Sequence, residues 1–313
     1  MAGYILRRII ATIPVMLIVA VVVFLMLRLT PGDPAAVIAG DNASPADIAM
    51  IRKSLDLDQP ILYQFIHWLG GILTGDFGQS FFFKKSVASL IADRIEPTLA
   101  LAVGTILIAV AIAVPLGILA AARRGSLLDR VVMGFSVLGF SVPVFVIGYA
   151  LDYLFAIKLG WLPVQGYQRL ADGFGGFLLR LILPCMSLAI VYIALIARMT
   201  RTSLLEVLGE DYIRTAKAHG LGRTAVLVKH ALPNAAVPIV TVIGLGIAVL
   251  IGGVVVTESV FAIPGLGRLT VDAVLARDYP TVQAVILLFS IIYVLVNLMI
   301  DIAYTALDPR IRY

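Results

Sequence analysis

Residues 203–233 read S-L-L-E-V-L-G-E-D-Y-I-R-T-A-K-A-H-G-L-G-R-T-A-V-L-V-K-H-A-L-P and form the longest charged interruption in the C-terminal two-thirds of an apolar chain. Within this stretch Leu205, Leu208, Tyr212 and Ala216 recur at intervals of three and four residues. That spacing places them on one face of a helix, and an apolar face requires other protein to pack against.

Turn-forming and capping residues divide the stretch in two. Asp211 is expected to cap a short helix that Gly220 and Gly222 end, and Thr224 to cap a second helix running toward Pro233. Two short helices at an angle are therefore predicted. Because apolar runs of membrane-spanning length lie on both sides, we expect this hairpin at a membrane surface.

The composition is that of an integral membrane protein. Hydrophobic residues make up 61% of the chain and charged residues 14%, with a mean hydropathy of +1.03. A helix needs about 20 apolar residues to cross hydrocarbon. The sequence predicts an all-α fold with six spans: Ile9–Leu27, Pro97–Ala122, Val131–Leu151, Leu181–Ala197, Ala231–Thr257 and Tyr279–Ile300.

Basic residues indicate the orientation, because Lys and Arg resist translocation. With the N-terminus inside, the cytoplasmic segments hold 13 Lys and Arg residues, against five in the two short outer loops. Both termini and the hairpin are therefore expected in the cytoplasm. This topology explains the net charge of +5 without nucleic-acid binding.

Three regions follow from the spans. The first span is followed by Thr30-Pro31-Gly32-Asp33-Pro34, which favours a helix break. A polar cap segment with two helices comes next; Ser44-Pro45-Ala46-Asp47 starts the first of these and Pro60 the second. The predicted regions are 1–30 for the first span, 31–96 for an extracytoplasmic helical cap and 97–313 for a five-helix core that contains the hairpin loop 201–235.

The hairpin resembles a known motif, the "EAA" loop E-A-A-x3-G-x9-I-x-L-P of ABC-importer permeases. Ala216, Gly220, Leu232 and Pro233 match it. Arg214, Thr215 and His230 depart from it, although R-T-A in place of E-A-A is typical of the dipeptide, oligopeptide and nickel branch. In this family the loop is the coupling helix, seated in a groove of a cytoplasmic ATPase.

Two further stretches resemble the B-type permease subunit of the dipeptide/oligopeptide/nickel importers. One is T-P-G-D-P after the first span, and the other is E-S-V-F-x-x-P-G-L-G-R-L from Glu258, followed by Arg277-Asp278-Tyr279-Pro280. The second reads physically as a turn-rich hairpin with a buried hydrophobic tip. The resemblance covers essentially the whole chain.

This resemblance implies two sets of site residues. Coupling to the ATPase falls on Tyr212, Arg214, Thr215, Ala216, His219, Gly220, Leu221, Leu232 and Pro233. An outer gate or a docking surface for the binding protein falls on Glu258, Phe261, Pro264, Gly265, Leu266, Gly267 and Arg268. Two plainer interpretations remain: the hairpin only joins two spans, and Glu258 pairs with Arg268.

The resemblance also implies the partners and the mechanism. They are a homologous second permease subunit, two cytoplasmic ABC ATPases and an extracytoplasmic substrate-binding protein, all working by alternating access in the bacterial cytoplasmic membrane. No cofactor is expected in this chain, since ATP and Mg belong to the ATPases. Relatives with such loops serve peptides, nickel, opines and glutathione, so the substrate stays open.

Weakly polar and kinked positions in the spans are candidates for the transport pathway. They are Ser136, Ser141, Pro143, Gly244, Gly252, Ser290 and Asn297. The kinks could equally serve packing. The stripe of small residues that contains Gly244 and Gly252 invites close approach of a helix, either of this chain or of a second permease.

The absence of catalytic and nucleotide-binding motifs narrows the range of possible functions. No G-x-x-x-x-G-K-[ST] loop occurs, so the chain is not expected to bind ATP or to be an enzyme. The single cysteine, Cys185, suits packing. The alternative function is an ion-coupled secondary transporter or a channel subunit. Such carriers usually keep acidic residues at the membrane midplane, and these spans have almost none there.

Overall fold

The computed structural model describes residues 2–29, 32–40 and 43–307, and the side chains within these ranges except those of residues 2–6, 251–253 and 305–307. The chain forms two compact units. Unit 1 holds Pro97–Ile263 and the segment from Leu295 onward, and unit 2 holds Ala2–Glu96 and Pro264–Val294.

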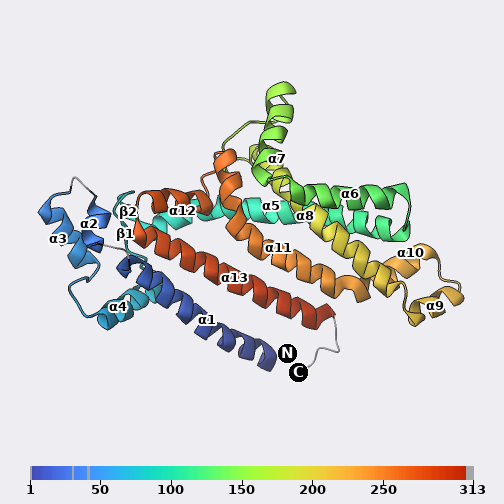
Figure 1. Ribbon diagram of the computed structural model, residues 1–313, viewed down its shortest axis with the longest axis horizontal. Helices are drawn as coiled ribbons and strands as arrows, with labels where there is room; N and C mark the ends of the chain where they lie inside the picture. Colours follow the sequence, from blue (N-terminus) through green and yellow to red (C-terminus); the bar gives the residue numbers. More distant parts are fainter. Residues whose placement is uncertain (1, 30–31, 41–42, 308–313) are drawn as a thin grey trace. The chain divides into compact units, whose positions relative to one another are not determined.

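Five helices of the described residues are long and apolar enough to cross a membrane, and a bent pair of shorter helices makes a sixth span if it is counted as one (Figure 1). The all-α expectation is therefore confirmed. The five long helices are α1 (Ala2–Arg28), α5 (Val87–Ala122), α8 (Phe174–Val207), α11 (Leu232–Val260) and α13 (Tyr279–Leu307).

The third predicted span, Val131–Leu151, differs from a single straight helix. It is broken into α6 (Leu127–Ser141) and α7 (Val144–Leu151), the second of which continues as the π-helical segment η1 (Asp152–Lys158). The two parts are bent by 104° (Figure 1). Pro143 accounts for the break, because it has no N–H to donate and forces Val142 before it into extended backbone, with ψ 125°.

Helix α8 packs closely against three other helices of unit 1 through their glycines. A Cβ on Gly117 of α5 would lie 2.5 Å from Thr200 Cβ, and one on Gly139 of α6 would lie 2.8 Å from Ala194 Cβ. On α11, a Cβ on Gly246 would lie 3.1 Å from the Tyr192 ring. The absence of side chains therefore lets these backbones approach α8.

The small-residue stripe on α11 also meets a helix of this chain. Gly244 faces Ile300 of α13, whose Cδ1 would lie 2.2 Å from an added Cβ. Gly252 lies outside the residues whose side-chain surroundings are described. The neighbours of Gly244 and Gly246 are thus α13 and α8. At these two positions the helix that approaches the stripe belongs to this chain and not to a second permease.

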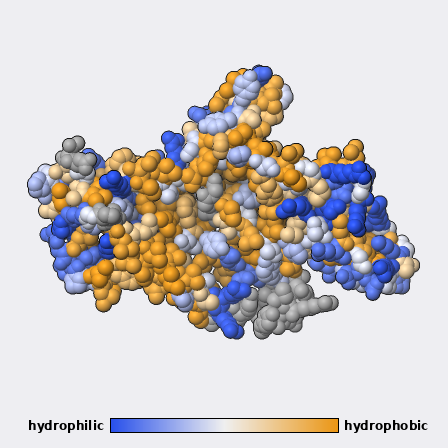
Figure 2. Space-filling view, viewed as in Figure 1, coloured by the Kyte–Doolittle hydropathy of each residue, from blue (hydrophilic) through white to orange (hydrophobic). Residues whose placement is uncertain are grey.

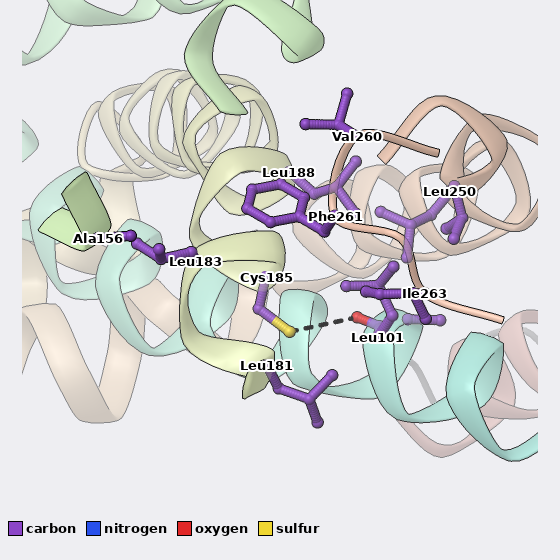
Figure 3. Packing of buried hydrophobic residues seen from close by; sticks show 12 residues of the cluster. Leu101, Ala156, Leu181, Leu183, Cys185, Leu188, Leu250, Val260, Phe261 and Ile263 are labelled. Atoms are coloured by element: carbon purple, nitrogen blue, oxygen red, sulfur yellow. Dashed lines mark hydrogen bonds between the residues drawn. The ribbon is translucent and has the colours of Figure 1, made fainter. Parts of the chain in front are cut away.

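Cys185 lies within a buried apolar cluster of unit 1, shown in Figure 3. Its side chain is 1% exposed, and its thiol donates to the carbonyl of Leu101 at 3.7 Å. Leu181, Leu188 and Leu250 belong to the same cluster. This environment agrees with a packing role for the cysteine.

Unit 2 contains the cap segment. The cap segment is formed by α2 (Pro34–Ala39), α3 (Pro45–Ser54), α4 (Ile61–Thr74) and the antiparallel strands β1 (Gln79–Ser80) and β2 (Lys85–Ser86). Helix α12 (Leu266–Leu275) also belongs to unit 2. Helix α3 starts at Ser44 as predicted, and the structure adds a capping box, in which Ser44 Oγ accepts from the Asp47 amide and Asp47 Oδ2 accepts from the Ser44 amide. The hydrogen bonds from Ser44 hold the pKa of Asp47 below its usual value.

Aromatic and buried polar contacts tie unit 2 together. Phe24 of α1 meets Phe65 of α4 edge-on, with ring centroids 5.1 Å apart. The carboxylate of Asp278, 1% exposed, accepts hydrogen bonds from Ser80 of β1 and Thr281 of α13. The expected turn-rich hairpin around residues 258–268 is corrected in one respect, because a helix, α12, begins at Leu266.

Candidate functional site

The predicted hairpin contains only one short helix. Helix α8 ends at Val207, and α9 (Asp211–Ala218) follows. The next turn, α10 (Arg223–Ala225), runs through the π-helical segment η3 (Val226–Ala231) directly into α11. The second predicted helix is therefore the start of a long one.

Both predicted N-caps are wrong by one or two residues. Glu210 precedes α9 and makes no side-chain cap, while Asp211 lies in the first turn and accepts from Arg214 at 3.1 Å. Gly222, rather than Thr224, precedes α10. The first-turn carboxylate still suits the positive end of the α9 dipole.

Gly220 ends α9 as the sequence predicts. Its φ of +79° is in the left-handed region, and its amide donates to the carbonyl of Lys217 at 3.0 Å. Nothing lies within 4 Å of the position that a Cβ would take. Backbone conformation, and not lack of space, therefore makes glycine suitable here.

The inner face of α9 is formed by Ile213 and Ala216, which are 0% and 9% exposed. They lie in a buried region with Leu204 of α8 and Val226 of η3, and Ile213 belongs to the same apolar cluster as these two. The predicted face is wrong for Leu205, Leu208 and Tyr212: the chain leaves the helix at Leu208, so the first two are not part of α9. The spacing of Ile213 and Ala216 was the signal for the true inner face.

The other side of α9 is exposed. Tyr212 is 44% exposed, and burial of its remaining surface together with the charge of Glu210 raises its pKa. The ion pair of Arg214 with Asp211 is solvated, so it adds at most about 1 kcal/mol of stability. The exposed predicted coupling residues are Tyr212, Arg214, Thr215, His219, Gly220, Leu221 and Pro233, and Leu232 is half-buried.

Hydrophilic side chains gather over α9 and α10, at the lower right of Figure 2. A cavity of about 470 Å³ lies between this hairpin and the end of α5, where Ala121 and Leu208 contribute apolar walls. Two of its other lining residues, Lys217 and Arg223, are basic. The hairpin thus offers a polar, partly basic surface fixed on an apolar base.

The second predicted set, residues 258–268, is divided between the units. In unit 1, Glu258 is fully buried and accepts from the Thr98 hydroxyl at 2.6 Å, and Phe261 is 2% exposed. In unit 2, Gly265, Leu266 and Gly267 are buried, whereas Pro264 and Arg268 are exposed. Pairing of Glu258 with Arg268 stays a prediction.

The candidate pathway residues mostly bond within their own helices. The hydroxyls of Ser136, Ser141 and Ser290 each donate to the carbonyl four residues earlier, at 2.9, 3.0 and 2.8 Å. Ser136 is buried, Ser141 is exposed, and Asn297 is half-buried on α13. Pro143 lies at the bend between α6 and α7. Their role in the pathway stays a prediction.

Sequence reasoning missed one buried ion pair next to the hairpin. Arg201 of α8 donates to Asp129 of α6 through Nε and Nη2, at 2.5 and 2.8 Å. Asp129 is 4% exposed and also accepts from the amide of Gly125 at 2.9 Å. The two residues are 72 positions apart, so no local pattern could pair them.

Comparisons with known proteins cover the whole chain. The family described as "Binding-protein-dependent transport system inner membrane component" matches residues 113–313, and its N-terminal counterpart matches residues 1–102. A solved MetNI methionine ABC transporter in an inward-facing conformation shares the fold, with a TM-score of 0.58 and 21% identity over 70% of this chain and 96% of that one.

Curated relatives align from end to end. A probable peptide ABC transporter permease protein of Sinorhizobium fredii is 54% identical over 313 residues, covering 100% of both chains. The glutathione transport system permease protein of Salmonella choleraesuis is 46% identical over the same length, also with 100% coverage of both. These matches and the apolar spans show an inner membrane protein that works with ATPase and substrate-binding partners. The chain belongs to the family of binding-protein-dependent transport system inner membrane components, the permeases of ABC transporters.

Proposed function

We propose that this chain is the B-type permease subunit of an importer for peptides or similar small solutes, working by alternating access. The names of the relatives support this substrate class: a peptide permease at 54% identity and a glutathione permease at 46%. Glutathione is itself a tripeptide. Both termini and the α9 hairpin lie in the cytoplasm, on the argument from basic residues given above.

The coupling role is inferred from the two faces of α9, one buried against the rest of unit 1 and the other exposed. Ile213 is fully buried against α8 and η3, so a displacement of α9 is passed to the ends of these helices. Tyr212 and Leu221, 44% and 41% exposed, offer apolar surface on the same hairpin. Tyrosine is one of the residues that most often anchor a protein to its partner, so Tyr212 is the main candidate contact with the ATPase.

The proposed machine contains a homologous second permease, two ATPases that hold ATP and Mg, and an extracytoplasmic binding protein. ATP closes the ATPase pair, which moves α9 and opens the spans toward the binding protein. Hydrolysis returns the spans to the inward-open state. This chain contributes the transmembrane path and the hairpin, and the ATPases contribute the chemistry.

Reconstitution tests the proposal. The complex is assembled in liposomes with ATP enclosed, the binding protein is added outside, and uptake of a radiolabelled dipeptide is measured. We expect uptake only when ATP and the binding protein are both present. A cysteine at position 212, in a Cys185→Ser background, should also crosslink to the ATPase, whereas one at the buried position 213 should not.

The rival functions predict different outcomes. Uptake by this chain alone, driven by a proton or sodium gradient, would identify an ion-coupled carrier. Flux down a gradient without ATP or binding protein would identify a channel. Either result would overturn the importer assignment.

A further inference from the structure

Unit 2 encloses a second cavity, of about 510 Å³, that the transport role above does not use. Its size is within the range of small-molecule sites, about 300–1,000 Å³. Segments far apart in sequence line it, including the end of α1, helix α4 and the start of α13. Asp76, Phe77 and Gly78 contribute to its wall, as does Pro280 of the Arg277-Asp278-Tyr279-Pro280 stretch.

Arg28 at the end of α1 lines this cavity with its guanidinium held in place. Its Nε donates to Gln64 Oε1 at 2.8 Å, its Nη1 donates to the Phe24 carbonyl at 3.0 Å, and its Cζ lies 3.5 Å from the centre of the Phe24 ring. Gln64 is 8% exposed and is itself fixed, since its Nε2 donates to the Gln59 carbonyl at 2.8 Å. The guanidinium is therefore preorganised.

Within the part of the chain that the structure describes, the three contacts of Arg28 are all with uncharged groups. No carboxylate in the described parts of the chain forms an ion pair with it. A guanidinium carries five N–H donors, and the described residues accept from two of the Arg28 nitrogens, Nε and Nη1. An oxyanion such as a carboxylate or a phosphate is the ligand that suits a fixed guanidinium, because the pair can form two parallel hydrogen bonds.

The same cavity carries negative charge. Asp76 lines it and is exposed; its Oδ1 accepts from the Gly78 amide at 2.9 Å, and no hydrogen bond to its Oδ2 occurs among the described residues. Asp56 also lines it but is paired with His67. A simple anion would be repelled by these acids and a simple cation by Arg28. A ligand that carries both charges satisfies both.

Aromatic side chains supply the remaining wall. Trp68, Phe77 and Phe81 line the cavity beside Leu27 and Leu55. Such surfaces hold the hydrocarbon part of a ligand, whereas the few charged groups fix its orientation.

We propose that this cavity binds a small zwitterion, with its oxyanion on Arg28 and its primary ammonium on Asp76. Two sources carry this chemistry. One is a short free peptide, with a terminal carboxylate and a terminal ammonium, and the other is the phosphate and ammonium of a phosphatidylethanolamine headgroup. The lining lies wholly in unit 2, so the site is separate in composition from the α9 hairpin of unit 1.

Binding without ATP or binding protein tests the site. The full chain, assembled with its partner subunits, is placed in nanodiscs of phosphatidylglycerol alone. Equilibrium dialysis measures binding of the radiolabelled dipeptide Ala-Phe, of its C-terminal amide and of its N-acetyl form. In a second arm, nanodiscs containing phosphatidylethanolamine are used, and native mass spectrometry counts the phosphatidylethanolamine molecules that remain bound.

Saturable binding is expected in one of the two arms. Arg28→Gln should weaken it about 10- to 100-fold, the effect of losing a hydrogen bond between charged groups. Asp76→Asn should weaken it through the ammonium, and the amide and N-acetyl forms should each bind more weakly than Ala-Phe. The matched control is Arg52→Gln, which changes another arginine of the cap segment that pairs with Asp33 and does not line the cavity.

Two results would overturn the proposal: no saturable binding in either arm, or binding that Arg28→Gln and the blocked peptides leave unchanged. If Arg28→Gln does not assemble, the blocked peptides decide the matter in the peptide arm, and Asp76→Asn decides it in the lipid arm. ATP-driven uptake is measured in parallel, so that a failed importer and an empty cavity give different results.

Discussion

Arg201 on α8 donates two hydrogen bonds, of 2.5 and 2.8 Å, to the carboxylate of Asp129 on α6. Asp129 also accepts from the amide of Gly125, in the turn between α5 and α6. One buried carboxylate therefore joins α6 and the turn before it to α8, on the part of α8 that leads to the α9 hairpin. Its charge is satisfied by a planar, bidentate partner, which is the geometry that a buried ion pair needs.

Removing one partner of this pair should destabilise the protein. Asp129→Asn leaves the Arg201 guanidinium without its counter-charge, and because the Arg201 side chain is 20% exposed we expect a loss of about 1.5–3 kcal/mol in the free energy of unfolding. Thermal unfolding of the assembled complex in nanodiscs measures it. Arg214→Gln is the control, since its pair with Asp211 is exposed and should contribute at most about 1 kcal/mol. Equal effects of the two variants would contradict a structural role for the buried pair.

Gly220→Val should uncouple ATP hydrolysis from transport. A β-branched residue disfavours the φ of +79° at this position, so the end of α9 should change its path. We expect the assembled variant to lose substrate-stimulated ATPase activity and dipeptide uptake.

Gly222→Val is the matched control for Gly220→Val. Gly222 has a φ of −63° and, like Gly220, has nothing within 4 Å of an added Cβ. This control should retain coupling, and Gly220→Asn should be intermediate because asparagine tolerates the left-handed region. Normal substrate-stimulated ATPase in assembled Gly220→Val would count against the role of this glycine.

Gly117→Ala should separate α5 from α8. The added methyl would lie 2.8 Å from the Ala197 carbonyl oxygen as well as 2.5 Å from Thr200 Cβ, and backbone cannot move aside as a flexible side chain can. We expect a loss of about 1–3 kcal/mol, as for other overpacked interiors. Gly134→Ala on α6 should be neutral or stabilising, because its Cβ meets nothing within 4 Å. If both variants unfold at the same temperature, α5 and α8 do not pack as closely at Gly117 as the structure shows.

Replacement of Pro264-Gly265-Leu266-Gly267 by a flexible linker should abolish uptake. If the segment is part of the gate or of the docking surface, binding-protein-stimulated ATPase activity should be lost as well. Unchanged uptake would show that the segment is only a connector.

A stability control is needed for this replacement. Leu266 is fully buried in a cluster with Val87 and Leu269, and Leu266→Ala alone should cost about 2–5 kcal/mol. Thermal unfolding of Leu266→Ala therefore shows how much of the uptake defect comes from a weakened unit 2. A defect larger than that of Leu266→Ala points to contact with a partner.

Helix starts and helix ends could be predicted from the sequence, because they depend on a few neighbouring residues. The helix start at Ser44 and the left-handed glycine at 220 are both present as predicted. The spans were recognisable because a long apolar run has few alternatives to a membrane helix.

Contacts between residues far apart in the sequence could not be predicted. Asp129 with Arg201 and Gly244 with Ile300 depend on how helices pack, and a single sequence does not record that. The inner face of α9 was predicted wrongly because α8 ends before Leu208 and α9 begins only at Asp211. Gly209 between them marks this break, but the helical spacing was continued across it. Pro143 indicated a kink in the third span, but the bend angle of 104° depends on what α7 packs against.

The glycines that face α8 limit how this part of the protein can move. At Gly104, Gly117, Gly139 and Gly246, side chains of α8 pack directly on the main chain of the neighbouring helices, so sliding one helix past another would drive these side chains into larger residues or into the backbone. Helices α5, α6, α8 and α11 are therefore suited to swing together as a rigid block around α8. Flexing during a transport cycle should then concentrate at the joints that lack such contacts, such as the break at Pro143.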